Sequence, residues 1–508
     1  MAGLAVALAA LAVPTAASAR DDVVTSFDGT RIELSFFPAP NLKAGQQAPT
    51  VLIGPGWAQS RDSASSGGSS LFGYLGPKEF LDAGYNVLTW DPRGFGSSEG
   101  TVESDSPAYE GRDVSRLIDY VARQPEARHD RRCRVRHRHG HSRRVCTTKP
   151  NDPRLGMEGA SYGGGIQLVT AGRDRRIDAL IPVISWNSLI TSLDKDGAVK
   201  GGWATVLYDA GLAASHNRLD PHIGNAYQEG LTTGRVSEGN RLWFESRGPG
   251  DKLVNRIRVP TLLVQGTADT LFTLKEAIRN YGILHRNHVP VKMMWFCGGH
   301  GTCLTDAGPD GPLADAMLAW FARYLKRRDV DTGPGFEWID QDGTWRSSRA
   351  WPPRRVGELK TTGAGVLPLM PGFADSGDPI AATPAATAVH VAVPAPQQQR
   401  LAVGLPELKL TYSGFGAPSP TSFVYAQIVD LERGVVMGPV VRPIPVTLDG
   451  QEHTISRPLE GIAWTLRPGG SYELQITPST QVYGPQRDSG QVSISSAQLS
   501  IPLVAPGG

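Results

Sequence analysis

One short stretch limits the fold of this 508-residue chain more than any other. Residues 156–169 read GMEGASYGGGIQLV and place Ser161 between Gly159 and Gly163, in the pattern G-x-S-x-G. A strand-like run precedes the serine and a helix-like run follows it. A strand that turns this sharply into a helix needs small residues on both sides of the turn. The pattern predicts an exposed serine nucleophile, and a glycine-rich turn without a catalytic role is the alternative.

Short apolar runs alternate with amphipathic stretches over residues 49–328, which is typical of an α/β fold with a mostly parallel sheet. The strand-like runs are PTVLIG, YNVLTW, RLGMEG, IDALIPVIS, VPTLLVQG and VPVKMMWF. The stretches GRDVSRLIDYVARQP and PLADAMLAWFARYLKRR carry apolar residues at helical spacing. We therefore expect a catalytic α/β domain over residues 20–330.

The alternation breaks over residues 186–258, a stretch that is longer than a usual crossover and rich in aromatic residues. This pattern predicts a helical cap inserted into the catalytic domain. Ordinary crossover helices are the alternative.

An acid and a histidine follow two later strand-like runs, in the order that this kind of nucleophile requires. Asp269 comes just after VPTLLVQG, and His300 lies in a glycine-rich loop after VPVKMMWF. Because the carboxyl ends of parallel strands share one edge of a sheet, we expect both side chains to meet Ser161 there. His300 would accept the proton of Ser161, and Asp269 would orient the imidazole.

The reaction also needs donors for the oxyanion that forms on the substrate carbonyl. We expect one donor to be the backbone N–H of Tyr162. The other should come from the loop after the first core strand, where the N–H of Gly56 or of Trp57 is the candidate.

These residues together resemble the CocE/NonD hydrolases and the Xaa-Pro dipeptidyl-peptidases of peptidase family S15. The resemblance rests on GASYGG, DPRGFGSSEG, GTADTLF and GGHG, and on the β-rich C-terminal region. It implies an α/β-hydrolase core, a helical cap and a jelly-roll-like domain. It also implies hydrolysis of esters or of amide bonds after Xaa-Pro through an acyl-enzyme, with Ser161, Asp269 and His300 as the triad. The loop of residues 54–57 reads GPGW and lacks the tyrosine that completes the oxyanion hole in cocaine-esterase-like members.

The composition and the pattern of the sequence change after residue 330. Residues 331–400 are rich in Ala, Pro, Thr and Gln in their second half, and we expect a linker or irregular segment there. Short β-rich runs separated by turn signals then recur over residues 401–508. This pattern predicts a β-sandwich domain.

The N-terminus has the pattern of an export signal. Residues 4–13 are apolar, and Ala17-Ser18-Ala19 fits a cleavage site after Ala19, although no basic residue precedes the apolar run. We expect residues 1–19 to be a signal peptide and the mature protein to be secreted or held at the cell surface, without stable membrane insertion. An alanine-rich helix of the mature domain is the alternative.

Four cysteines fit an oxidising compartment, in which three pairings are open. We favour the pairs that are local in sequence, Cys297–Cys303 and Cys133–Cys146. The first pair would fix the loop that carries His300.

Residues 128–146 are dense in Arg and His where a surface loop is expected. A solvated insertion, a metal site, attachment to a polyanion and a translated frameshift are all open. The spacing of Cys133, Cys146 and the histidines matches no usual zinc pattern, so no metal is predicted. No cofactor is predicted either. The net charge of +2 gives no reason to expect nucleic acid as a partner, and the oligomeric state is left open.

We therefore expect an exported serine hydrolase that acts on a small ester or peptide. A dipeptidyl-peptidase needs a carboxylate for the free amine of its substrate, and the cap offers Asp194, Asp196, Glu229, Glu238 and Glu245. The alternative is a catalytically silent exported protein whose β-domain binds carbohydrate or cell wall.

Overall fold

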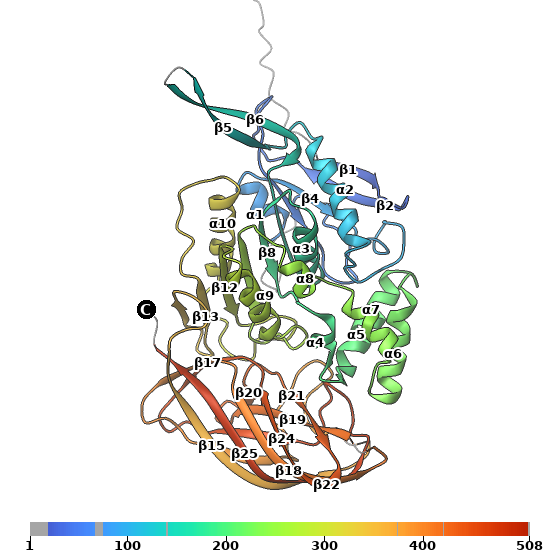
Figure 1. Cartoon of the computed structure of the whole chain (residues 1–508), viewed down its shortest axis with the longest axis vertical. Coiled ribbons are helices and arrows are strands. Elements are labelled where there is room, and N and C mark those ends of the chain that lie inside the picture. Colours follow the sequence, from blue (N-terminus) through green and yellow to red (C-terminus); the bar gives the residue numbers. More distant parts are fainter. Residues whose placement is uncertain (1–18, 67–74, 139–140, 373, 420, 506–508) are drawn as a thin grey trace, which may run out of the picture.

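The computed structural model describes residues 19–66, 75–138, 141–372, 374–419 and 421–505 of the chain. Nearly all of the predicted signal peptide lies outside these residues. Figure 1 shows an α/β region that carries a helical group at one side and a β-rich region that covers one end.

A ten-stranded mixed sheet forms the centre of the first region. Seven neighbouring strands, from β4 to β13, run parallel, and antiparallel strands flank them on both edges. The strands in spatial order are β1 (Arg20–Thr25), β2 (Arg31–Phe37), β4 (Asn86–Trp90), β3 (Thr50–Ile53), β7 (Leu155–Ala160), β8 (Ile177–Val183), β11 (Thr261–Gly266), β12 (Val291–Phe296), β13 (Phe336–Ile339) and β14 (Trp345–Ser348). The six strands predicted from apolar runs are all present.

Helices cover both faces of this sheet, because alternate residues of each buried strand point to opposite sides. One core packs the sheet against α2 (Glu110–Ala122), α3 (Tyr162–Arg173), α8 (Gly250–Val254) and α9 (Leu274–Arg286). The other packs it against α1 (Pro77–Asp82) and α10 (Pro312–Tyr324). On β3, for example, Leu52 belongs to the first core, and Val51 and Ile53 belong to the second. The predicted α/β fold is confirmed.

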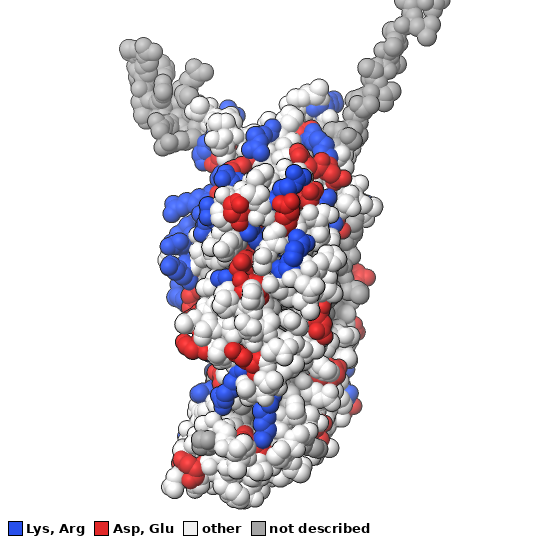
Figure 2. All heavy atoms as spheres, turned by 90° about the vertical axis from the view of Figure 1, so that its right-hand side faces the viewer, with Lys and Arg blue, Asp and Glu red and all other residues white. Residues whose placement is uncertain are grey.

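Between β8 and β11 the chain forms helices α4 (Leu189–Leu193), α5 (Gly201–Ala214), α6 (Pro221–Thr233), α7 (Glu238–Glu245) and α8, with the short strands β9 (Asp194–Lys195) and β10 (Ala198–Val199). Figure 1 places α5, α6 and α7 together at one side of the α/β region. Helix α8, which lies within the predicted cap range of 186–258, packs in the first core of the sheet, so we call residues 186–248 the cap segment. On the face that carries α6 and α7, Figure 2 shows basic and acidic side chains interspersed among uncharged ones.

The C-terminal region consists of two antiparallel sheets that enclose one apolar core. One sheet contains β15 (Arg355–Leu369), β17 (Arg400–Gly404), β18 (Glu407–Ala417), β22 (Asp449–Pro458), β23 (Ile462–Leu466) and β25 (Ser489–Val504). The other contains β16 (Val389–Val393), β19 (Thr421–Asp430), β20 (Val435–Val436), β21 (Arg442–Thr447) and β24 (Tyr472–Thr477). Two sheets around a shared core agree with the predicted sandwich. Jelly-roll connectivity stays a prediction.

The prediction that residues 331–400 form a linker or irregular segment is wrong. This range supplies β13 and β14 to the edge of the central sheet, and β15 and β16 to the β-rich region. β15 is hard to recognise because only Leu367 and Leu369 in it are buried, and Gly363 and Gly365 face the core where apolar side chains would mark a strand. The β-rich region therefore begins near residue 355, about 45 residues before the predicted boundary at 401.

The surface loop expected over residues 128–146 is also corrected. Strands β5 (His129–Arg138) and β6 (His141–Pro153) form a two-stranded antiparallel ribbon that projects from the α/β region (Figure 1). The backbones of Cys133 and Cys146 are paired in its register. Cys146 is disulfide-bonded. The side chain of Cys133 and the histidines of the alternative metal site lie outside the described side chains.

Candidate active site

Ser161 sits at a strained turn between β7 and α3. Its backbone has φ 56° and ψ −116°, a conformation that non-glycine residues adopt mainly where the surroundings enforce it. The Ser161 N–H donates to the carbonyl of Val183 on the neighbouring strand, at 2.9 Å. A Cβ on Gly163 would lie 2.0 Å from the carbonyl oxygen of Gly54, and one on Gly159 would lie 2.6 Å from it. The glycines are therefore needed because the turn packs directly on the loop that follows β3.

The structure brings the three predicted triad side chains together at the carboxyl edge of the sheet. The Nε2 atom of His300 lies 2.8 Å from Ser161 Oγ. Its Nδ1 atom lies 3.0 and 2.9 Å from the two carboxylate oxygens of Asp269. The imidazole can thus accept the serine proton on one side while the carboxylate holds the other nitrogen.

The carboxylate of Asp269 is fully buried and receives further donors from its own loop. Oδ1 accepts the backbone N–H groups of Leu271 at 3.1 Å and Phe272 at 2.8 Å. Oδ2 accepts the side-chain amide of Gln265 at 3.1 Å. These donors offset the desolvation of the carboxylate and keep it directed at His300. Sequence reasoning missed Gln265, which reads as an ordinary strand residue.

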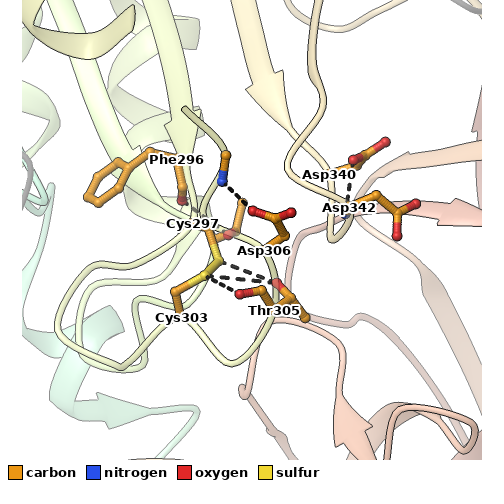
Figure 3. The surroundings of a disulfide bond; sticks show 9 residues. Phe296, Cys297, Cys303, Thr305, Asp306, Asp340 and Asp342 are labelled. Atoms are coloured by element: carbon orange, nitrogen blue, oxygen red, sulfur yellow. Dashed lines mark hydrogen bonds between the residues drawn. A yellow bond between two sulfur atoms is a disulfide. The ribbon is translucent and has the colours of Figure 1, made fainter. Parts of the chain in front are cut away.

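A disulfide closes the loop that carries His300. Cys297, directly after β12, is bonded to Cys303, and His300 lies between them. Thr305 lies beside both sulfurs, as Figure 3 shows, with its Oγ1 atom 3.4 Å from Cys297 Sγ. The predicted pairing of Cys297 with Cys303 is confirmed.

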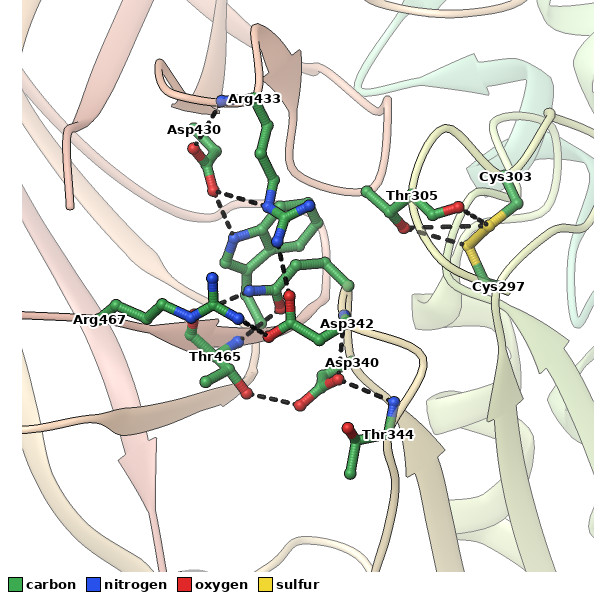
Figure 4. A network of polar contacts seen from close by, with 12 residues as sticks. Cys297, Cys303, Thr305, Asp340, Asp342, Thr344, Asp430, Arg433, Thr465 and Arg467 are labelled. Atoms are coloured by element: carbon green, nitrogen blue, oxygen red, sulfur yellow. Dashed lines mark hydrogen bonds and ion pairs between the residues drawn. A yellow bond between two sulfur atoms is a disulfide. The ribbon is translucent and has the colours of Figure 1, made fainter. Parts of the chain in front are cut away.

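The β-rich region reaches the same loop through the turn between β13 and β14, residues 340–344. The Asp306 N–H donates to the carbonyl of Gln341 at 3.3 Å, which joins the His300 loop to this turn. Gln341 in turn exchanges two 2.8 Å hydrogen bonds with the backbone of Thr465. Asp342 pairs with Arg433 and Arg467, both at 2.6 Å (Figure 4). Sequence reasoning missed this connection because the turn lies in the range expected to be a linker.

The predicted oxyanion donors are placed unequally. The Gly56 N–H donates to Gln59 Oε1 at 3.0 Å, so it is already engaged. The indole N–H of Trp57 donates to the carbonyl of Leu207 at 2.8 Å, which ties this loop to α5. Two of the predicted donors therefore remain for the oxyanion. They are the backbone N–H of Trp57 and the backbone N–H of Tyr162, which lies in the first turn of α3. Their rings touch, with centroids 5.3 Å apart.

Buried acids lie behind Tyr162, and sequence reasoning missed them. The Tyr162 hydroxyl accepts the backbone N–H of Asp105 at 3.1 Å and lies 3.4 Å from Glu110 Oε1. Burial, helped by the nearby Asp113, raises the pKa of Glu110 to about 8. Burial also raises the pKa of Asp105 well above its ordinary value. These contacts hold the hydroxyl end of Tyr162, the residue that directly follows Ser161.

A largely apolar pocket opens beside Ser161, and it spans about 940 Å³ when the solvent space at its open mouth is included. The cap segment supplies most of the wall. The described lining residues are Trp57, Ser104, Ser161, Tyr162, Trp186, Leu189, Ile190, Leu193, Asp194, Val199, Ala204, Leu207, Tyr208, Ile223, Ala226, Tyr227, Val236, Phe244, Leu271 and Phe272. Its size and character suit a small organic substrate or one or two amino-acid residues.

Asp194 is the one acidic residue among these lining residues. Its Oδ2 atom pairs with Arg241, whereas Oδ1 has no partner in the described part of the chain. Burial raises the pKa of this carboxyl group, although Arg241 opposes the shift. The other four cap carboxylates named above do not line the pocket; Asp196, for example, pairs with Arg442.

Within the residues that the structure describes, no group of three or more His, Cys, Asp or Glu side chains could hold a metal ion. No helix in the same residues is both long and apolar enough to cross a membrane.

Several solved structures share this fold over nearly the whole chain. A CocE/NonD family hydrolase from Staphylococcus aureus matches with a TM-score of 0.62 at 14% identity, covering 96% of this chain and 93% of that one. An aminopeptidase from a marine sediment Thaumarchaeota archaeon gives a TM-score of 0.66 at 16% identity, and 96% of each chain is covered. An α-amino acid ester hydrolase gives 0.68 at 13% identity, also over 96% of each chain. The fold is therefore that of the CocE/NonD-type α/β-hydrolases.

Sequence comparison gives the family. A Bacillus anthracis protein of the Xaa-Pro dipeptidyl-peptidase kind is 24% identical over 306 residues, which cover 58% of this chain and 48% of the relative. The match thus spans about half the length of that relative. The model of the X-Pro dipeptidyl-peptidase (S15) family matches residues 28–302, a range that contains Ser161, Asp269 and His300. Because this match covers more than half of the chain, the protein belongs to the S15 family of hydrolases.

Proposed function

We propose that the protein is an exported serine hydrolase that cleaves ester or amide bonds through an acyl-enzyme on Ser161. The observation that carries the proposal is the pair of contacts made by His300, 2.8 Å to Ser161 Oγ and about 3 Å to the Asp269 carboxylate. This arrangement beside an apolar pocket suits nucleophilic attack on a bound carbonyl group.

Acylation would begin when Ser161 Oγ attacks the substrate carbonyl carbon while its proton moves to His300 Nε2. The oxyanion of the tetrahedral intermediate would accept the backbone N–H groups of Tyr162 and Trp57. Loss of one such donor typically costs about 3 kcal/mol of transition-state stabilisation. Collapse of the intermediate breaks the bond to the leaving alcohol or amine, which takes the proton from His300.

Deacylation repeats these steps with water. His300 Nε2 removes a proton from a water molecule, whose oxygen attacks the acyl carbonyl carbon. The bond to Ser161 Oγ then breaks, the serine regains its proton from His300, and the carboxylic acid leaves. Asp269 stabilises the imidazolium in both halves without accepting its proton.

The pocket favours a substrate with an apolar acyl part and an amine. Its wall is built mostly from aliphatic and aromatic side chains, and one buried carboxylate oxygen, Asp194 Oδ1, has no partner among the described residues. A protonated amine would satisfy that oxygen. This favours a peptidase or an amino-acid ester hydrolase over an esterase for simple acyl chains.

Export is part of the proposal because the first 19 residues have the pattern of a signal peptide. Disulfide-bonded cysteines in the folded chain are in keeping with an oxidising compartment. Detection of the mature chain outside the cytoplasm, beginning at residue 20, tests this part directly.

A fluorophosphonate probe tests the nucleophile. We expect the wild-type protein to be labelled and Ser161→Ala to be unlabelled and inactive. Ser104→Ala is the matched control, because Ser104 lines the same pocket, and this variant should still be labelled. A well-folded wild type that resists labelling would instead support the silent binding protein.

A second experiment separates the substrate classes. Turnover of p-nitrophenyl butyrate is compared with that of Ala-Pro p-nitroanilide, for the wild type and for Asp194→Asn. If Asp194 holds the amine, the variant should raise KM for the dipeptide substrate about tenfold or more and leave the butyrate ester nearly unchanged. Equal changes on both substrates would exclude this role.

A further inference from the structure

A fully buried lysine lies next to the loop that carries the triad acid. Lys200, at the start of α5, is 1% exposed. Its ammonium group donates to the carbonyl oxygens of Thr270 at 2.7 Å and Leu271 at 2.8 Å. Within the described residues it forms no ion pair with a carboxylate. Lysine is rarely buried without a charged partner, so this position calls for an explanation.

The same two peptide groups contact Asp269 on their other side. The carbonyl of Thr270 and the N–H of Leu271 belong to one peptide group, and this N–H donates to Asp269 Oδ1 at 3.1 Å. The next peptide joins the carbonyl of Leu271 to the N–H of Phe272, which donates to the same oxygen at 2.8 Å. In a trans peptide the C=O and N–H bonds point in opposite directions. Each peptide therefore lies between the lysine cation and the aspartate anion.

We infer that Lys200 is a positioning residue for Asp269 and acts through these two peptide groups as its buried counter-charge. The ammonium polarises both carbonyls, which strengthens the N–H donors on the carboxylate. It also holds the 270–272 loop, so that Asp269 stays directed at His300. This inference rests on the proposed triad, and it gives the cap segment a part in the chemistry besides lining the pocket.

Other charged groups near Lys200 do not replace this role. The pKa of Lys200 is influenced by the charges of Lys195, Glu460, Asp269 and Glu276. Lys195 is paired with Glu460 at 2.7 Å, and Glu276 accepts the backbone N–H groups of the 187–188 segment. Burial lowers the pKa of Lys200 to about 7, so the ammonium form is present on the acid side of neutrality.

A purely structural tie between the cap segment and the loop is the competing explanation. Trp203 makes such a tie, because its indole N–H donates to Thr270 Oγ1 at 3.1 Å without adding charge. The two explanations differ in one respect. Removing a nearby positive charge makes an imidazole bind its proton more tightly, whereas loss of a neutral tie does not.

The experiment compares Lys200→Met and Lys200→Gln with the wild type, using whichever ester or dipeptide substrate is turned over. Lys195→Met is the control, because it removes a buried lysine from the same segment without touching the 270–271 carbonyls. Tm, kcat, KM and the pH dependence of kcat/KM are measured for each. We expect both Lys200 variants to lose about tenfold or more in kcat with KM within about twofold. The acid limb should move up by about 0.5 pH unit or more.

The result that overturns the inference is a folded Lys200 variant with wild-type kcat and acid limb. An equal shift of the acid limb in Lys195→Met would also overturn it. If Lys200→Met does not fold, Lys200→Gln removes the charge and keeps an N–H donor on a side chain one atom shorter, so its acid limb alone decides. Ser161→Ala is run in parallel. Activity in that variant would refute the proposed triad, whereas inactive Ser161→Ala with unaffected Lys200 variants refutes only the role of Lys200.

Discussion

The two loops that complete the proposed triad are held in opposite ways. The Asp269 loop is buried under the cap segment and fixed by noncovalent polar contacts, from Lys200, Trp203 and Gln265. The His300 loop is closed by the Cys297–Cys303 disulfide and braced from the β-rich region through residues 340–344.

The difference follows from what each loop must do in the proposed mechanism. The acid must stay ionised in a buried place, which takes oriented donors and a counter-charge. The base must change its protonation state in each cycle and face the pocket, so a covalent closure can fix it without adding charge nearby. We therefore expect the first loop to respond to changes of charge and the second to changes of covalent structure.

The largest effect should come from Asp269→Asn. The amide cannot serve as the anion that stabilises the imidazolium, and it favours the wrong tautomer of His300. We expect kcat to fall by about 10³- to 10⁴-fold while the fold is retained. Steady-state kinetics with circular dichroism checks this. A loss of less than tenfold in a folded variant would mean that the loop contributes geometry rather than charge.

Opening the disulfide should have a smaller effect of another kind. In Cys297→Ser/Cys303→Ser we expect about a tenfold loss in kcat with little change in the acid limb of the pH profile. For so short a loop, chain entropy predicts a loss of about 2 kcal/mol in the free energy of unfolding. Urea unfolding and kinetics test both numbers. A shifted acid limb would show that the disulfide, too, acts through charge.

The buried lysine should add a pH dependence to the free energy of unfolding, and opening the disulfide should leave that dependence unchanged. Burial lowers the pKa of Lys200 in the folded state to about 7, against an ordinary 10.5. Between these values the unfolded chain binds more protons, so this group makes the free energy of unfolding rise with pH, by at most about 1.4 kcal/mol per unit. Relative to Lys200→Met, the wild type should therefore gain stability from pH 7 to 10. The free energy of unfolding of Cys297→Ser/Cys303→Ser should change with pH in parallel with that of the wild type. Urea midpoints measured over this pH range check both expectations.

Much of this site could be predicted from sequence because its parts are local. Ser161, Asp269 and His300 each follow a strand-like run, and the order of strands along the chain brings them to one edge. The supports could not be found in this way. Lys200 has the residue type of a surface position, and its burial depends on how α5 meets the 270–272 loop. The turn at residues 340–344 is short, and its partners Arg433 and Thr465 lie more than 90 residues away.

The smallest effect should come from the ion pairs between that turn and the β-rich region. Asp342→Asn removes the charge that faces Arg433 and Arg467, whose side chains are 34% and 51% exposed. Solvent and salt screen such pairs, so we expect a loss of at most about 1 kcal/mol that shrinks at high ionic strength. The change in kcat should be less than about twofold, since Gln341 still holds the turn through its bonds to Thr465. If Asp342→Asn instead lost tenfold in kcat, and high salt lowered kcat of the wild type equally, the position of the His300 loop would depend on charge, as that of the Asp269 loop does.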